Sequence, residues 1–203
     1  MKTSIFALIL VFVAASAASA ATARVKLADG SVLEISASQI DGIGQFLSTV
    51  TLKGEAHLKT VGSTGSDTLE AQADKIVVAF SRKTDPKQAG QDMIRSADLI
   101  GSPQLTYVTK DPSTGALVKT TATSTSATYD GTTRTVRLKG NVKIVNENPA
   151  VFDGPAVMTG DEATINLRPK LGPDEPLFSI KSSPGPSRIE VTPKPKEEEK
   201  PKK

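Results

Sequence analysis

Two phrases that each occur twice constrain the fold of this chain more than any other feature. The first reads VTLKGEAHL at residues 50–58 and VRLKGNVKI at residues 136–144. The second reads LEAQADKI at residues 69–76 and MTGDEATI at residues 158–165. The copies lie 86 and 89 positions apart, which indicates one architectural unit used twice with a short loop insertion.

Apolar residues occupy every second position of these phrases, which is the period of a strand with one buried face. The parity of the apolar positions changes within residues 73–76 and 160–163, and again near residues 37–40 and 124–127. A change of parity indicates an extra residue, and hence a bulge or a corner. We therefore expect strands that bend around the corner of a rolled sheet or sandwich.

Almost everything between residues 23 and 192 reads as short strands joined by polar turns, rich in threonine, valine and serine. Only residues 86–100 favour a helical turn. Gly54 and Gly140 stand mid-strand at matching positions, which indicates bulges or close backbone approach. The prediction is an all-β fold with strands at residues 25–27, 32–35, 50–58, 69–80, 105–108, 117–129, 136–145, 157–167, 178–181 and 189–191.

Residues 1–20 predict a secretory signal peptide. Lys2 gives a positive start, residues 5–15 form an unbroken apolar run, and Ala18–Ala20 fits a cleavage site before Ala21. The run is shorter than the about 20 residues that a membrane span needs. We expect a periplasmic protein, with an uncleaved inner-membrane anchor through residues 5–15 as the alternative.

One domain is expected over residues 21–192, followed by a disordered charged tail at residues 193–203. The chain has no cysteine, so an exported domain must be stabilised without disulfides. The formal net charge of +3 includes a tail with five lysines and three glutamates. The folded part is then close to neutral, and the composition does not indicate nucleic-acid binding.

No catalytic constellation is found. His57 is the only histidine, and strand alternation places it with Lys53 and Glu55 on the face opposite the apolar residues. Zinc or serine–histidine chemistry would need clustered partners that the chain lacks. Asp74 and residues 161–162 fall at the parity changes, where polar corner residues are expected. We predict no catalytic residues, no metal site and no cofactor, and hence a protein that is not an enzyme.

The expected interior is mostly aliphatic. After residue 20 the chain has four phenylalanines, two tyrosines and no tryptophan. Aliphatic side chains can fill a thin sandwich completely, or they can leave an apolar slot for a guest molecule. The sequence favours the filled interior and leaves the slot open.

Three segments together resemble the OstA-like domain of the periplasmic lipopolysaccharide-transport family, which includes LptA, LptC and the N-terminal part of LptD. The segments are ATYD (127–130), RTVRLKGNVKI (134–144) and GDEATINL (160–167). The earlier copy at residues 50–80 looks like a more diverged instance. Gln72, at the place of Asp161, and an insertion at residues 86–103 depart from the pattern.

The resemblance implies a β-jellyroll of rolled antiparallel sheets, open at its ends. It implies that an apolar interior holds the acyl chains of lipopolysaccharide or a related envelope lipid. It also implies head-to-tail association of copies, and of other OstA-like components at the inner and outer membranes, into a bridge for lipopolysaccharide transport. Burial of an acyl chain contributes about 0.8 kcal/mol per CH₂ group.

The inward residues of the matched strands are the predicted lipid-binding residues, each acting through apolar contact alone. They are Val50, Leu52, Ala56, Leu58, Ile76, Val78, Phe80, Val136, Leu138, Val142, Ile144, Ile165 and Leu167.

Other functional classes stay open. A structural envelope protein with a dry core that assembles edge to edge would form filaments without lipid. A carbohydrate-binding module usually displays an exposed aromatic platform, which two tyrosines and no tryptophan disfavour. A hydrolase is disfavoured because this chain lacks a catalytic constellation.

Overall fold

The computed structural model describes residues 20–26, 30–42, 49–63, 65, 67–80, 94–111, 114–168, 171 and 175–194. Within these ranges the chain forms antiparallel strands, and no helix is long and apolar enough to cross a membrane. The strands are β1 (Ala21–Lys26), β2 (Val32–Ala37), β3 (Gln39–Asp41), β4 (Thr49–Val61), β5 (Thr68–Phe80), β6 (Ile94–Ile100), β7 (Gln104–Lys110), β8 (Leu117–Thr123), β9 (Ser126–Asp130), β10 (Thr135–Glu147), β11 (Ala156–Asn166), β12 (Phe178–Lys181) and β13 (Arg188–Glu190). The prediction of an all-β roll is confirmed.

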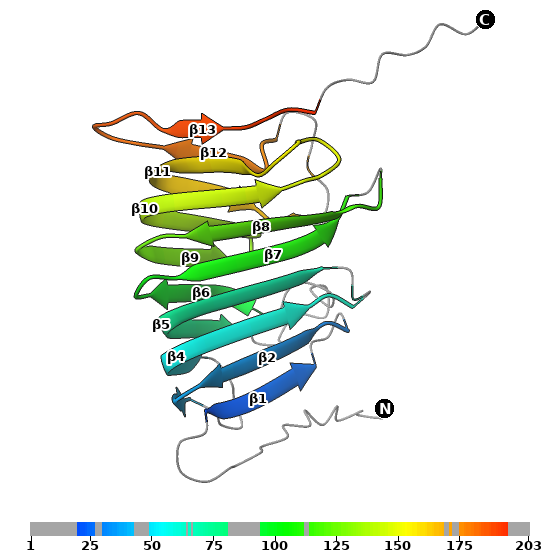
Figure 1. Ribbon diagram of the computed structural model, residues 1–203. Coiled ribbons are helices and arrows are strands. Elements are labelled where there is room, and N and C mark those ends of the chain that lie inside the picture. Colours follow the sequence, from blue (N-terminus) through cyan, green and yellow to red (C-terminus); the bar gives the residue numbers. More distant parts are fainter. Residues whose placement is uncertain are drawn as a thin grey trace, which may run out of the picture.

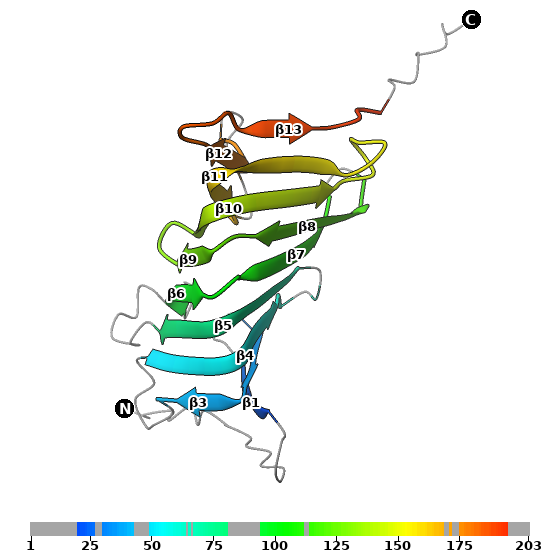
Figure 2. The same ribbon diagram turned by 60° about the vertical axis from the view of Figure 1, so that its left-hand side comes forward.

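The strands stack along one axis, from β1 at one end of the molecule to β12 and β13 at the other (Figure 1). Each long strand pairs with one set of neighbours along its first half and with another set along its second half. For example, β5 pairs with β7 through residues 68–72 and with β6 through residues 75–80. The sheet is therefore bent lengthwise into two layers, and Figure 2 shows β6 and β9 continuing away from β7 and β8 at the bend.

We call the two halves layer A and layer B, and the bend between them the corner. Layer A contains β3, β6, β9 and β12 with residues 49–53, 75–80, 135–139 and 162–166 of the long strands. Layer B contains β1, β2, β7, β8 and β13 with residues 56–61, 68–72, 143–147 and 156–160. Strands β6 and β7 follow one another across the corner like two halves of one interrupted strand, and so do β9 and β8. Hydrogen-bonded pairing therefore runs in a closed circuit from β5 through β6, β9, β10, β8 and β7 back to β5.

The repeated phrases form equivalent strand pairs. The first copy is the pair β4–β5 and the second is β10–β11, and β4 and β10 are both 13 residues long. The register of each pair shifts by one residue at the corner, between Lys53 and Ala56 of β4 and between Lys139 and Val142 of β10. The sequence predicts the extra residue in β5 and β11, whereas the structure places it in the partner strands β4 and β10.

One backbone arrangement recurs at three places along the corner: a glycine with positive φ is followed by a second residue with positive φ. The pairs are Gly54 (+71°) with Glu55 (+48°), Gly101 (+84°) with Ser102 (+48°), and Gly140 (+76°) with Asn141 (+50°). The carbonyl of each glycine accepts a hydrogen bond from a backbone amide of the neighbouring segment. The amide of Ser38 donates to Gly54 (2.9 Å), that of Asp74 to Gly101 (3.2 Å) and that of Thr125 to Gly140 (2.8 Å). Both predicted roles of Gly54 and Gly140, bulge and close approach, are confirmed.

Two elements differ from expectation. The segment 94–100, within the stretch expected to favour a helical turn, is strand β6, and it pairs with both β5 and β9. The single strand expected over residues 117–129 is divided into β8 and β9 at the corner residues Ser124 and Thr125. Residues 1–19 of the predicted signal peptide, residues 86–93 and residues 195–203 of the predicted tail lie outside the described residues.

Candidate functional site

All the predicted lipid-binding positions face one interior between the two layers. Twelve of them are buried, with relative exposures from 0% to 7%, and they belong to one hydrophobic cluster. Leu167, at the end of layer A, is partly buried and packs against that cluster. The structure thus brings the predicted set together, and contact of these residues with lipid stays a prediction.

The corners keep apolar residues inward along the whole length of each strand. In β5, Ala73 and Ile76 are buried while the two residues between them point away from the core. In β4, Leu52 and Ala56 are buried on either side of three exposed residues. The additional exposed residue of β4 is the bulge, and it allows the same face of both strands to stay inside as they cross from layer A to layer B.

The interior is closed in this structure. Leu52, Ile76, Val78 and Ile144 have no surface accessible to a water-sized sphere. Of the two interiors that the sequence leaves open, the filled one agrees with these exposures. An acyl chain would therefore have to separate the layers in order to enter.

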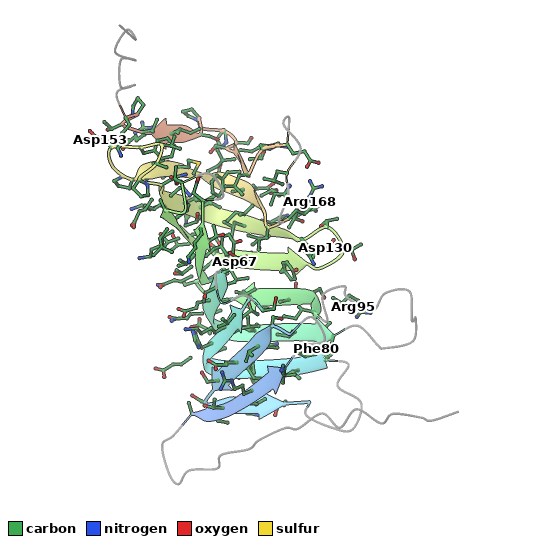
Figure 3. All side chains as sticks on the ribbon, turned by 90° about the vertical axis from the view of Figure 1, so that its right-hand side faces the viewer. Asp67, Phe80, Arg95, Asp130, Asp153 and Arg168 are labelled. Carbon is green, nitrogen blue, oxygen red and sulfur yellow. The ribbon has the colours of Figure 1, made fainter. Side chains whose placement is uncertain are left out.

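In the described part of the chain, the strands that pass from one layer to the other do so at the corner, and each layer has an opposite edge away from it. We call the edge of layer A rim A and the edge of layer B rim B. Figure 3 shows the residues near rim A (Phe80, Arg95, Asp130 and Arg168) toward one side of the roll, and those near rim B (Asp67 and Asp153) toward the other. Among the residues that the structure describes, no backbone hydrogen bond links rim A to rim B. Separation of the rims then costs apolar side-chain contact and leaves the strand ladders intact, and an acyl chain can replace apolar contact.

Several interior residues were not predicted. Strand β6 contributes Ile94, Ala97 and Leu99, whose spacing departs from strict alternation because the β5–β6 register shifts near Phe80. Strands β1 and β2 close one end of the interior with a set of small and aliphatic residues. These are Ala23, Val25, Leu33, Ile35 and Ala37.

A polar row crosses the inner face of layer B. Thr120 and Asn146 are each only 5% exposed, and the Asn146 side-chain amide donates to the Thr120 hydroxyl over 2.8 Å. Tyr107 is the register partner of Thr120 and is half-buried. Burial raises the pKa of the Tyr107 phenol, against a smaller lowering by its hydrogen bond with the Thr109 side chain. The phenol therefore stays protonated at neutral pH and can donate a hydrogen bond.

A cavity lies on the outer side of the roll, where the β10–β11 loop meets β7 and β8. It has a volume of about 500 Å³, and its wall contains Val108, Leu117, Lys119, Glu147, Asn148, Pro149, Phe152, Asp153, Gly154 and Pro155. The Lys194 ammonium donates to the Pro149 carbonyl over 2.8 Å, and the Lys194 amide donates to the Val151 carbonyl over 3.1 Å. The first residues of the predicted tail are thus bonded to this loop.

The outer faces carry exposed ion pairs rather than a concentrated charge. The pairs include Lys53–Asp41 (2.9 Å), Lys59–Glu70 (2.7 Å) and Arg24–Glu34 (3.0 Å). Within the described residues, no group of three or more histidine, cysteine or acidic side chains is placed to hold a metal ion. His57 is half-buried on β4, facing away from Leu58.

Comparison with known proteins finds a likeness in structure. The chain is similar to the crystal structure of LptH from Pseudomonas aeruginosa, described as the LptA-homologous periplasmic component of the conserved lipopolysaccharide transport device. The TM-score is 0.50 at 12% sequence identity, and the match covers 80% of this chain and 95% of LptH. What they share is the fold. No family model matches the sequence, and no curated protein matches it.

Proposed function

We propose that this chain is a periplasmic, non-enzymatic protein of the OstA-like type that binds the acyl chains of lipopolysaccharide or a related envelope lipid between its two layers. The observation that carries the proposal is the continuous apolar interior, which runs from β1 to β12 and whose two layers are joined at the corner by the long strands. The likeness to LptH, which spans 95% of that protein, supports the same role.

Lipid entry is favourable because apolar contact between the two layers is replaced by apolar contact between each layer and the acyl chain. The residues that would separate are alanine, valine, leucine and isoleucine for the most part, with few polar groups to desolvate. Each buried CH₂ group of the guest contributes about 0.8 kcal/mol, so a chain of about ten carbons can offset a substantial loss of contact between the layers. The intact ladders at the corner would allow the roll to close again after release.

The ends of the roll support end-to-end association with further copies or with other OstA-like components of the transport bridge. Within the described residues, β1 pairs only with β2, and β13 pairs only with β11. Each therefore offers a row of unpaired backbone groups that a strand of a second molecule can satisfy. A series of molecules joined end to end in this way would carry lipid between the inner and outer membranes.

Site-specific photocrosslinking tests the lipid proposal. A photoreactive phenylalanine analogue replaces Phe80, which faces the interior near rim A, and the protein is irradiated with purified lipopolysaccharide. We expect a covalent adduct at position 80 and none at Arg137, which faces outward between two buried residues of β10. A folded protein that gives no adduct at position 80, or equal adducts at both positions, would overturn the proposal.

A structural envelope protein with a dry core is the second candidate, and the closed interior is the observation that favours it. It predicts filaments in the absence of lipid and no lipid in an organic extract of the protein purified from the periplasm. Recovery of stoichiometric lipid from that extract would exclude it.

A further inference from the structure

Layer B has a polar row, and the matching part of layer A is apolar apart from the partly buried Tyr129. Tyr107, Thr120 and Asn146 are register neighbours on β7, β8 and β10, and they share the inner face with Leu105, Ala122 and Ile144. The inner face of layer A toward rim A contains Phe80, Ile94 and Leu167, together with Tyr129, which packs against the same cluster. Among the described residues, the buried threonine and asparagine side chains, Thr120 and Asn146, both belong to layer B.

Stability does not explain the polar row. A buried hydroxyl–amide pair returns little net free energy, because both groups lose their hydrogen bonds to water on folding. Two apolar side chains of similar shape at Thr120 and Asn146 would be neutral or stabilising by the same reasoning. Every other inward position of β10 is apolar, including Val142 and Ile144.

The position of the row suits one part of a bound lipid. Asn146 lies four residues from Val142 at the corner, which is about 13 Å along the strand. Apart from Ser124 at the corner, whose hydroxyl donates to the Ser126 carbonyl over 2.9 Å, that interval is apolar in the neighbouring strands, and beyond the row Thr109 donates to the Asp67 carboxylate over 2.7 Å at rim B. The wall therefore passes from apolar at the corner to hydrogen-bonding at Tyr107, Thr120 and Asn146, and to charged at Asp67.

We propose that Tyr107, Thr120 and Asn146 form a subsite that hydrogen-bonds the polar linkage groups at the head end of bound acyl chains: their ester, amide or hydroxyl oxygens. This inference rests on the proposed lipid-binding function. The subsite orients the lipid with its chain ends toward the corner and its head group out between the rims. It also makes the protein selective for acylated amphiphiles over plain hydrocarbons.

The row supplies the groups that such recognition needs. The Tyr107 phenol and the Thr120 hydroxyl can each donate and accept, and the Asn146 amide provides two donors and one acceptor oxygen. An entering linkage group can take the place of one partner in the Thr120–Asn146 bond, so that the site stays satisfied with and without lipid. The apolar wall of layer A then covers the hydrocarbon part of the same molecule.

The test uses the double variant Thr120→Val with Asn146→Leu, because either single change would leave a buried polar partner unpaired. Two probes are compared by fluorescence: hexa-acylated lipid A, measured by its displacement of a bound dye, and 1-pyrenyldodecane, a hydrocarbon without oxygen. We expect affinity for lipid A to fall roughly tenfold, and affinity for pyrenyldodecane to change less than about twofold. Thr121→Val, which faces outward on the same strand, is the matched control and should change neither.

The outcomes separate the subsite from the general function. Unchanged preference for lipid A in the folded double variant, or an equal loss for both probes, overturns the subsite. Failure of the unaltered protein to bind either probe overturns the lipid-binding function itself. If the double variant does not fold, Tyr107→Phe removes only a hydroxyl, and it should lower lipid A affinity by about twofold to fivefold without affecting pyrenyldodecane.

Discussion

The backbone amide of Thr125 donates to the carbonyl of Gly140 over 2.8 Å, and the Thr125 hydroxyl donates to the same oxygen over 3.2 Å. A Cβ atom on Gly140 would lie 2.6 Å from that hydroxyl oxygen. The contact therefore requires both the positive φ and the missing side chain of glycine. The same close approach occurs between Ser38 and Gly54, so the corner is one arrangement repeated along the roll.

Gly140→Ala should destabilise the protein by about 2–3 kcal/mol, because it combines a strained φ with a clash against Thr125. Urea unfolding at neutral pH measures the effect. The matched control is Gly154→Ala, since a Cβ atom there has no neighbour within 4 Å and the residue lacks a positive φ. Equal midpoints for the two variants would contradict a special role of the corner glycine.

Glu55→Asn should stabilise the protein by about 0.5 kcal/mol. Glu55 has a φ of +48°, and Asn141 occupies the equivalent position of the second copy with a φ of +50°. Asparagine tolerates this left-handed conformation better than glutamate, since its short side chain can hydrogen-bond locally. The reciprocal change, Asn141→Glu, should lower the free energy of unfolding by a similar amount. Shifts of the same sign in both variants would show that backbone conformation does not decide these positions.

Glu70→Gln should flatten the acid limb of the stability curve. The Lys59 ammonium lies 2.7 Å from the Glu70 carboxylate, and this hydrogen bond lowers the pKa of Glu70. A carboxyl with a lowered pKa in the folded state stabilises the protein above its unfolded pKa of about 4.3, and that contribution is lost as pH falls through the folded pKa.

Thermal unfolding at pH 7, 4 and 3 measures this effect. At pH 7 the unaltered protein should be the more stable of the two, by a small margin because the pair is about one-third exposed, and the two should converge as the pH falls from 5 to 3. Glu190→Gln on the exposed strand β13 serves as the control. Parallel curves for the Glu70→Gln variant and the unaltered protein would contradict the prediction.

Ile189→Lys should weaken end-to-end association. Ile189 is 62% exposed on β13, at the end of the roll where a second copy would add a strand. A lysine there places a charge in the new interface, and charged residues protect natural sheet edges from pairing. Light scattering across a concentration series measures the change. Leu117→Lys is the control, because Leu117 is 60% exposed on β8 in the middle of the stack. Loss of association in both variants would point to general apolar adhesion.

Local sequence pattern predicts the strands well where alternation is strict. Both copies of the repeated phrase form long strands that bury the expected residues, and β12 begins and ends at the predicted residues 178 and 181. Strand β6 was missed because its buried residues, Ile94, Ala97 and Leu99, are not evenly spaced. That irregularity follows from the register shift against β5, which depends on pairing and cannot be inferred from one strand.

The polar row could have been noticed in the sequence but not interpreted. Asn146 has the same parity as the inward residues Val142 and Ile144, and Thr120 has the parity of Ala122. Threonine and asparagine at one inward position each are unremarkable in an isolated strand. Their alignment with Tyr107 appears only when β7, β8 and β10 are in register.

The sequence by itself determined that the fold is all-β, where the strictly alternating strands lie, which face of each is apolar, and where that face must switch at a corner. These properties depend on residues close together in the chain, through the alternation of Cβ directions along a strand. Only the tertiary structure decided which strands pair, that the extra residue lies in β4 and β10, and that the interior is closed along rims between which the described residues form no backbone hydrogen bond. Those properties depend on the partner that each face and edge meets, which alternation leaves unspecified.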